Sequence, residues 1–132
     1  MLTHVDNNGL PTMVDVSGKN ISVRTAEALT TVYLPDEIMS CLKGEEIVSS
    51  KGPVFQTAII AGTMAAKRTS DLIPFCHPLG IESCKIKIKV SGENRIEIRS
   101  FLKVSGKTGI EMEALVASSI AALTVYDMCK GL

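Results

Sequence analysis

The chain has 132 residues, and its 14 lysines and arginines balance its 14 aspartates and glutamates. This length predicts one domain, residues 1–132, whose folding would remove about two thirds of the unfolded surface from water. The balanced charge argues against a nucleic-acid partner. No apolar run approaches the roughly 18 residues of a membrane span and no signal peptide is recognisable, which argues against a membrane or secreted protein.

The chain is aliphatic, with 3 Phe, 2 Tyr, no Trp and a mean hydropathy of +0.25. Such an apolar surplus in a small chain indicates that further surface is buried between subunits, so we expect a homo-oligomer. The 4 cysteines are scattered, without a CxxC pair, and are expected to be reduced thiols in a cytoplasmic protein.

The first half of the chain predicts short elements. Residues 1–12 lack periodicity and are expected to be a mobile arm. Alternating apolar and polar residues with a Thr-Thr-Val-Tyr end favour a strand over 24–34. The other pieces are a short extended segment at 13–19, a short helix that begins at Pro35 and stops at Gly44, and a linker at 45–50.

The second half gives clearer signals. A helix is predicted over 54–67, and Gly62 in its middle needs a packing reason because glycine costs about 1 kcal/mol there relative to alanine. Residues 84–90 and 95–104 alternate apolar with mostly charged side chains, which predicts a β-hairpin covered by helices on one side only.

The last predicted helix, 111–130, carries no charge between Glu113 and Asp127. Helical spacing predicts its core face to be Met112, Leu115, Val116, Ser119, Ala122, Leu123 and Tyr126. The opposite face is also apolar or small, so we expect the helix to be buried nearly all round. The order strand, helix, helix, strand, strand, helix predicts an α+β, ferredoxin-like fold, an antiparallel sheet with helices packed on one face.

Two short segments invite a chemical interpretation. Residues 105–109 form a glycine-rich turn before a helix, but Phe101 stands where a Walker loop needs glycine, so a plain turn or a weak anion site remains. Cys76 and His77 lie on a segment stiffened by prolines. One adjacent Cys-His pair is poor support for zinc or for a nucleophile with its base, and a buried thiol beside a loop histidine is the simpler interpretation.

Lysines and one aspartate form the third candidate group. Asp127 and Lys130, three positions apart at the end of an uncharged helix, could be partly desolvated and exchange protons. Alternatively, Lys130 only complements the helix dipole. Lys51 on its Gly-Pro turn and Lys67 at a helix end could also be solvated surface charges.

Long blocks of sequence resemble the cyclic pyranopterin monophosphate synthase family of molybdenum-cofactor biosynthesis, the MoaC proteins. The blocks are MVDVSGK at 13–19, KGPVF at 51–55, AGTMAAKRTSDLIPFCHPL at 61–79 and KTGIEMEALVASSIAALTVYDMCK at 107–130. The resemblance implies an enzyme that converts 3′,8-cyclo-7,8-dihydroguanosine 5′-triphosphate to cyclic pyranopterin monophosphate and releases pyrophosphate. It also implies a ferredoxin-like fold and a hexamer, a trimer of dimers with active sites at subunit interfaces. Family members usually continue past the last helix into a further strand, so the sheet is expected to have an edge without that strand.

The resemblance also implies roles for individual residues. The implied catalytic residues are Lys51, Asp127 and Lys130, and the implied substrate-binding residues are Arg24, Lys67, Cys76, His77, Glu111 and Glu113. No cofactor or resident metal is required, although Mg²⁺ can accompany the substrate phosphates. A triphosphate needs several cations, and rebuilding the ring needs proton transfers at fixed positions. Lys51, Lys67 or His77 is expected to stabilise the leaving pyrophosphate, with Asp127 and Lys130 as an acid/base couple.

Two alternatives of other classes stay open. A non-catalytic ligand-binding or regulatory module of the same fold would bind nucleotide without turnover. A metal-dependent hydrolase that uses His77 and the carboxylates would hold a transition metal and lose activity with a chelator.

Overall fold

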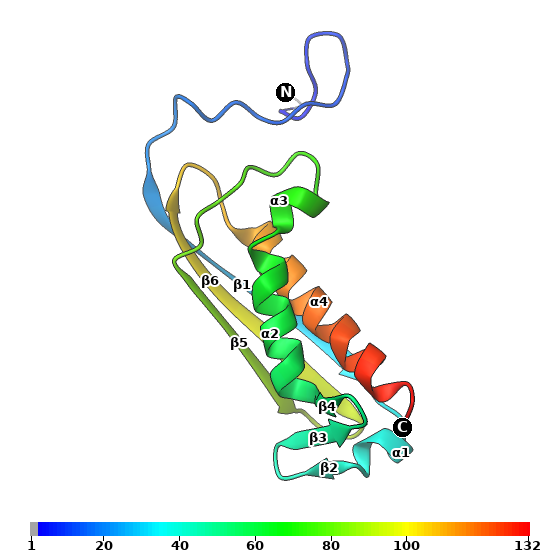
Figure 1. Ribbon diagram of the computed structural model, residues 1–132. Helices are drawn as coiled ribbons and strands as arrows, with labels where there is room; N and C mark the ends of the chain where they lie inside the picture. Colours follow the sequence, from blue (N-terminus) through cyan, green and yellow to red (C-terminus); the bar gives the residue numbers. More distant parts are fainter. Residues whose placement is uncertain (1–2) are drawn as a thin grey trace.

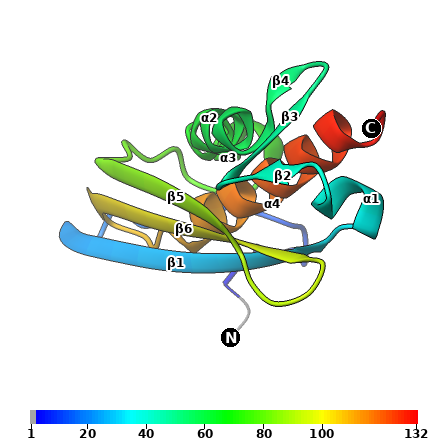
Figure 2. The same ribbon diagram turned by 90° about the horizontal axis from the view of Figure 1, so that it is seen from below.

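Three long strands form the main sheet of the computed structural model, which describes residues 3–132. They are β1 (Ser22–Tyr33), β5 (Ser83–Val90) and β6 (Arg95–Gly106), paired antiparallel in the order β1-β6-β5. The two long helices, α2 (Val54–Ala66) and α4 (Glu111–Cys129), lie on the same face of this sheet (Figures 1 and 2). This is the predicted α+β, ferredoxin-like arrangement.

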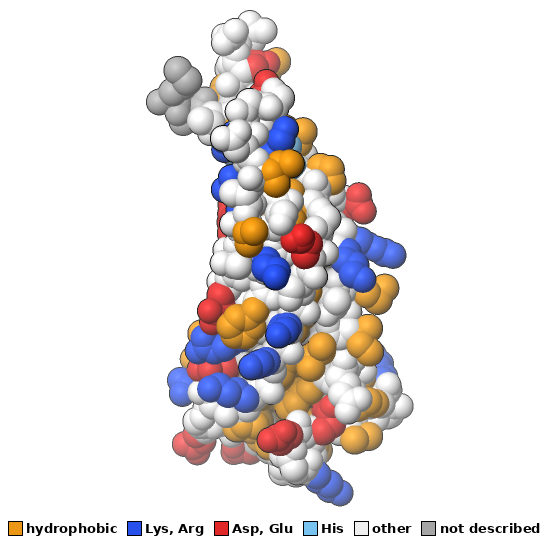
Figure 3. Space-filling view, turned by 90° about the vertical axis from the view of Figure 1, so that its left-hand side faces the viewer, with side chains coloured by type: hydrophobic (Ala, Val, Ile, Leu, Met, Phe, Trp, Pro, Cys, Tyr) orange, Lys and Arg blue, Asp and Glu red, His pale blue; other side chains and the backbone are white. Residues whose placement is uncertain are grey.

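Alternation along β6 separates the two faces of the sheet. Its apolar residues Ile96, Ile98, Leu102 and Val104 are at most 2% exposed and face the helices. Burying such a side chain contributes about 1.5–3 kcal/mol. The opposite face carries the charged side chains of β5 and β6, among which lysines and arginines predominate (Figure 3). The alternation predicted for 84–90 and 95–104 is therefore confirmed.

Gly62 lies at a tight contact of α2 with both α4 and β5. A Cβ atom on Gly62 would be 2.7 Å from the carbonyl oxygen of Ala117 and 2.7 Å from Cδ1 of Ile86. A methyl group has no room at those distances. With alanine at this position, the two helices could not lie as close together as they do. The packing reason expected for this glycine is confirmed.

A second, smaller sheet lies at one end of the molecule. It consists of β2 (Leu42–Lys43), β3 (Glu46–Ser49) and β4 (Gly52–Pro53), in that order, beside the one-turn helix α1 (Asp36–Met39). The linker predicted at 45–50 was wrong, because β3 occupies most of it. The predicted helix stop was also wrong: α1 ends before Gly44, which takes φ +63° in the turn between β2 and β3. Residues 13–19 form no strand, and α3 (Thr69–Leu72) is an additional short helix.

The long helix α4 buries the opposite face from the one predicted. Its buried residues are mostly small: Glu113, Ala114, Ala117, Ser118, Ala121, Val125, Met128 and Cys129. The larger Leu115, Leu123 and Tyr126 are 48%, 60% and 65% exposed. Small side chains let the helix backbone lie close to α2 and the sheet, so the larger ones are left outside. Within residues 3–132, α4 alone is long and apolar enough to span a membrane, yet here it packs as a core helix.

Candidate active site

The residues singled out from the sequence fall into two groups at opposite ends of α4. Glu111 begins this helix and Asp127 lies in its last turn. At about 1.5 Å of rise per residue, the two positions are about 24 Å apart along the helix axis. Lys51 and Lys130 belong to the end with Asp127, while Cys76, His77 and Glu113 belong to the end with Glu111.

The first group is a lysine–aspartate–lysine cluster. The Lys51 ammonium lies 3.0 Å from Oδ2 of Asp127 and also donates to the Asp127 carbonyl oxygen at 3.4 Å. The Lys130 ammonium lies 3.2 Å from Oδ1 of the same carboxylate. Hydrogen bonds from Lys51 and then from Lys130 lower the pKa of Asp127 below its ordinary range. The cluster therefore holds two ammonium groups around one firmly ionised carboxylate.

The expected desolvation of this cluster is absent in the single chain. The side chains of Lys51, Asp127 and Lys130 are each between 53% and 55% exposed. Lys51 is presented by the turn between β3 and β4, in which its backbone N–H donates to Oγ of Ser49 at 3.1 Å. Gly52 takes φ +110°, a conformation that other residues rarely adopt, so the turn depends on glycine at this position.

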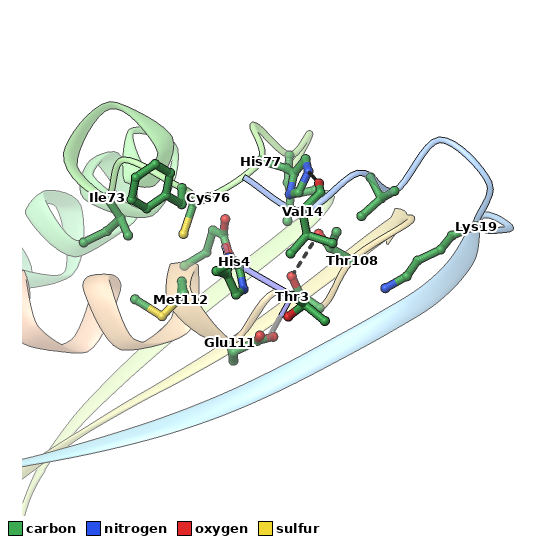
Figure 4. Close-up of a pocket in the computed structure, with 15 residues that line it drawn as sticks. Thr3, His4, Val14, Lys19, Ile73, Cys76, His77, Thr108, Glu111 and Met112 are labelled. Carbon is green, nitrogen blue, oxygen red and sulfur yellow. Dashed lines mark hydrogen bonds between the residues drawn. The ribbon is translucent and has the colours of Figure 1, made fainter. Parts of the chain in front are cut away.

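The second group lines a cavity of about 530 Å³ at the start of α4 (Figure 4). Cys76, His77, Glu111 and Glu113 all contribute to its wall. Nε2 of His77 lies 2.6 Å from the carbonyl oxygen of Val14. A carbonyl can only accept a hydrogen bond, so Nε2 carries the proton and donates it. This bond ties the segment before β1 to the segment after α3.

Burial controls the titration of the cavity's acid groups. Glu113 is only 3% exposed. Burial raises the pKa of its carboxyl group, its own backbone N–H opposes the rise, and the charge of Glu111 adds to it. Burial also raises the pKa of the Cys76 thiol, and Glu113 and Glu111 add to that rise. Burial thus favours the neutral form of Glu113 and of Cys76, so the cavity wall offers both donors and acceptors of hydrogen bonds to a ligand.

Two predicted site residues lie outside this cavity. Lys67 caps the end of α2 and lies near Cys84, where it partly opposes the rise that burial causes in the thiol's pKa. Nε of Arg24 donates to the carbonyl oxygen of Gly106 at 3.1 Å, which holds the guanidinium against β6. Neither Lys67 nor Arg24 is among the described residues that line the cavity.

Sequence reasoning missed two residues of the cavity wall with ionisable side chains, His4 and Lys19. The arm at 4–12 folds into a closed hairpin, in which Oδ1 of Asp6 accepts the N–H groups of Asn8 and Leu10 at 2.8 and 2.9 Å. The N–H of Thr12 then donates to the carbonyl oxygen of His4 at 2.9 Å. The run Asp-Asn-Asn-Gly at 6–9 is a turn signal that could have indicated this hairpin.

The structure also bears on the glycine-rich turn at 105–109 and on the metal-dependent alternative. Residues 105–109 do not form an open anion site, because the Glu111 carboxylate packs against Gly109 at the start of α4. Within residues 3–132, no group of three or more His, Cys, Asp and Glu side chains is arranged to hold a metal ion. The metal-dependent hydrolase therefore finds no ligand set in the described part of the chain.

Comparison with known proteins gives consistent matches. The model of the MoaC family matches residues 13–132. A protein from Xanthomonas oryzae pv. oryzae named cyclic pyranopterin monophosphate synthase is 53% identical over 131 residues, which cover 99% of this chain and 79% of that protein. The molybdenum cofactor biosynthesis bifunctional protein of Synechocystis is 52% identical over 136 residues, covering 100% of this chain and 39% of that protein. Molybdenum cofactor biosynthesis protein 1 of Dictyostelium discoideum is 48% identical, covering 98% of this chain and 23% of that protein.

Proposed function

Because the chain belongs to the MoaC family, we propose that it is a cyclic pyranopterin monophosphate synthase of molybdenum cofactor biosynthesis. Its substrate is then 3′,8-cyclo-7,8-dihydroguanosine 5′-triphosphate, and its products are cyclic pyranopterin monophosphate and pyrophosphate. The observation that carries this proposal is the pairing of two chemistries on one helix, a cationic cluster at its end and an acid-lined cavity at its start. A nucleoside triphosphate presents both matching chemistries, phosphates and a ring bearing N–H groups.

The cationic cluster suits the phosphoryl chemistry. Cyclisation of the phosphate expels pyrophosphate, so positive charge is needed where negative charge develops. The ammonium groups of Lys51 and Lys130 supply that charge, and Asp127 keeps both in place through bonds of 3.0 and 3.2 Å. When substrate displaces one of the two ammonium groups from Asp127, the carboxylate becomes free to accept a proton. The lysine that remains beside it can then donate a proton.

The cavity suits the ring. The ring edges of guanine and of a pterin carry N–H donors, whose hydrogen bonds the carboxyl oxygens of Glu111 in the cavity wall can accept. Burial raises the pKa of Glu113 and so favours its protonated form, in which the carboxyl group can donate to a ring carbonyl or nitrogen. His77, held by its bond to Val14, presents its remaining nitrogen on a fixed segment of the wall. Lys67 and Arg24, at the same end of the molecule, are proposed to meet the phosphates from outside the cavity.

One chain cannot bring the two groups to one substrate, because α4 separates them by about 24 Å. We therefore place each active site between two copies. A two-fold axis across α4 sets two helices antiparallel, so the end of one meets the start of the other. The exposed Leu115, Leu123 and Tyr126 offer the apolar contact for such an interface. A hexamer built as a trimer of these dimers is the proposed assembly.

The proposed compartment is the cytoplasm. The cysteines at 41, 76, 84 and 129 are all free thiols, which suits a reducing compartment such as the cytoplasm. No resident cofactor is proposed, and Mg²⁺ enters with the triphosphate that it neutralises.

Turnover of the cyclised nucleotide by the purified protein tests the reaction. Equal amounts of pyrophosphate and cyclic pterin are expected, and nucleotide binding without either product would favour the non-catalytic module instead.

Mixing inactive Lys51→Ala with inactive His77→Ala tests the shared site. If the two groups come from different copies, random exchange restores about a quarter of the wild-type activity, because half of the dimers carry one intact site. A site within one chain would stay inactive in the mixture.

A further inference from the structure

The helix that follows the Lys51 turn begins without a cap of its own. The residue before its first turn is Pro53, whose side chain makes no capping hydrogen bond, and the first turn of α2 contains no acidic residue. The first backbone N–H groups of a helix have no partner within the helix, so they need one from elsewhere. In α2 that partner comes from the second sheet.

Glu46, the first residue of β3, supplies the missing acceptors. Its Oε1 accepts the N–H of Phe55 at 2.8 Å, and its Oε2 accepts the N–H of Gln56 at 3.1 Å. Oε1 also accepts the N–H of Ile47 at 2.8 Å, which fixes the side chain against its own strand. A carboxylate in this place is stabilised both by charge-assisted hydrogen bonds and by the helix dipole.

The charge of this carboxylate also acts on a thiol at the end of α4. Burial raises the pKa of the Cys129 thiol, and Cys41 and then Glu46 add to the rise. Cys129 is in the final turn of α4, as is Asp127. Glu46 thus bonds to both sides of the segment that carries Lys51, through Ile47 in β3 before the turn and through Phe55 and Gln56 in α2 after it.

We propose that Glu46 is a positioning residue for Lys51. By bridging β3 to the start of α2, it holds both ends of the turn at 49–53, and this sets the Lys51 ammonium opposite the Asp127 carboxylate. Loss of the bridge lets the turn move and separates the pair. A shift of about 1 Å at a reacting group can lower a rate about 100-fold, so the bridge matters for turnover as well as for the fold. Only this kinetic consequence rests on the proposed function.

A simple helix cap would behave differently from a positioning residue. Replacing Pro53 by aspartate in the Glu46→Ala background would return a side-chain acceptor to α2, because Pro53 has the extended backbone of a cap residue, with φ −70° and ψ 122°. The double variant Glu46→Ala/Pro53→Asp therefore has a capped helix but no bridge to β3. If Glu46 only caps, that variant regains all wild-type properties.

The test is an NMR titration of the Asp127 carboxyl group, which does not depend on turnover. Lys51 and Lys130 lower its pKa in the wild type. Glu46→Ala should raise this pKa to the value found in Lys51→Met, and the double variant should recover thermal stability without recovering the pKa. Glu45→Gln, an exposed acid next in sequence, is the matched control and should leave the pKa unchanged. A wild-type pKa in Glu46→Ala, or in the double variant, would overturn the proposal.

Two further measurements complete the design. If Glu46→Ala does not fold, Glu46→Gln retains the shape and one acceptor oxygen, and the same pKa comparison decides. In turnover assays, Glu46→Ala should lower kcat about 10- to 100-fold with little change in KM, since Lys51 is displaced while the ring cavity is untouched. An inactive wild-type protein would reject the proposed function, but it would leave the NMR result to decide the role of Glu46.

Discussion

The Lys51 ammonium and the Asp127 carboxylate meet at 3.0 Å although the two residues are 76 positions apart in sequence. The contact joins the turn between two short strands to the last turn of α4 (Figure 1). Lys130 reaches the other oxygen of the same carboxylate at 3.2 Å. A half-exposed carboxylate between two ammonium groups contributes little to folding. The proposed function gives this arrangement a role, because there the substrate displaces one ammonium group from the carboxylate.

Replacing Lys51 by methionine should abolish turnover while the fold survives. Removing one group that stabilises developing charge lowers kcat about 100-fold or more. The side chain is 53% exposed, so its loss leaves the core intact. Steady-state release of pyrophosphate and a thermal melt measure the two effects. The exposed Lys43 on β2 provides the control, and a Lys51→Met enzyme as active as Lys43→Met would remove Lys51 from the mechanism.

The strands and helices were predictable where one face of an element is apolar and the other is not. In β6, Ile96 and Ile98 alternate with charged residues, so the register and the buried face follow directly. In α4 both faces are apolar, and periodicity could not tell them apart. The face with the small residues Ala117 and Ala121 is the buried one, because only small side chains fit the close approach of α4 to α2 at Gly62. That choice depends on a neighbouring helix and not on α4 alone.

The candidate site was predictable only as separate pieces. The resemblance marked Lys51 and Asp127, but their contact arises because α2, which follows the Lys51 turn, packs against α4, and local sequence does not encode that packing. Glu46 was missed because β3 is only 4 residues long and reads as a linker. His4 was missed because a hairpin held by the Asp6 side chain has no hydrophobic periodicity.

Replacing Glu113 by glutamine should stabilise the protein at neutral and alkaline pH. Burial raises the pKa of this carboxyl above its ordinary 4.5, so the unfolded chain ionises before the folded one as pH rises. The wild type therefore loses stability as pH rises from 4.5 through the folded pKa, and below 4.5 the two proteins should melt alike. Melting temperatures across that range measure the difference. Equal melting temperatures of the wild type and Glu113→Gln at alkaline pH would show that ionising the buried carboxyl group does not destabilise the fold.

The same variant should make Cys76 more reactive. Burial, Glu113 and Glu111 raise the pKa of this thiol, so little thiolate is present at neutral pH. Removing one negative charge by Glu113→Gln lowers that pKa, and the alkylation profile with iodoacetamide should move to lower pH. Mass spectrometry of the Cys76 peptide gives the rate. Glu97→Gln, on the far face of the sheet, should not move the profile, and a shift in that variant would attribute the effect to overall charge.

Gly62→Ala should destabilise the protein even though alanine favours a helix. The added Cβ would lie 2.7 Å from the Ala117 carbonyl oxygen, so α2 and α4 would have to separate. Overpacking of this kind costs about 1–3 kcal/mol, which exceeds the roughly 1 kcal/mol that alanine gains over glycine in a helix. Urea unfolding measures the change. Gly131→Ala is the control, since a Cβ there meets nothing within 4 Å. A Gly62→Ala protein as stable as that control would mean that the two helices can separate without loss of core packing.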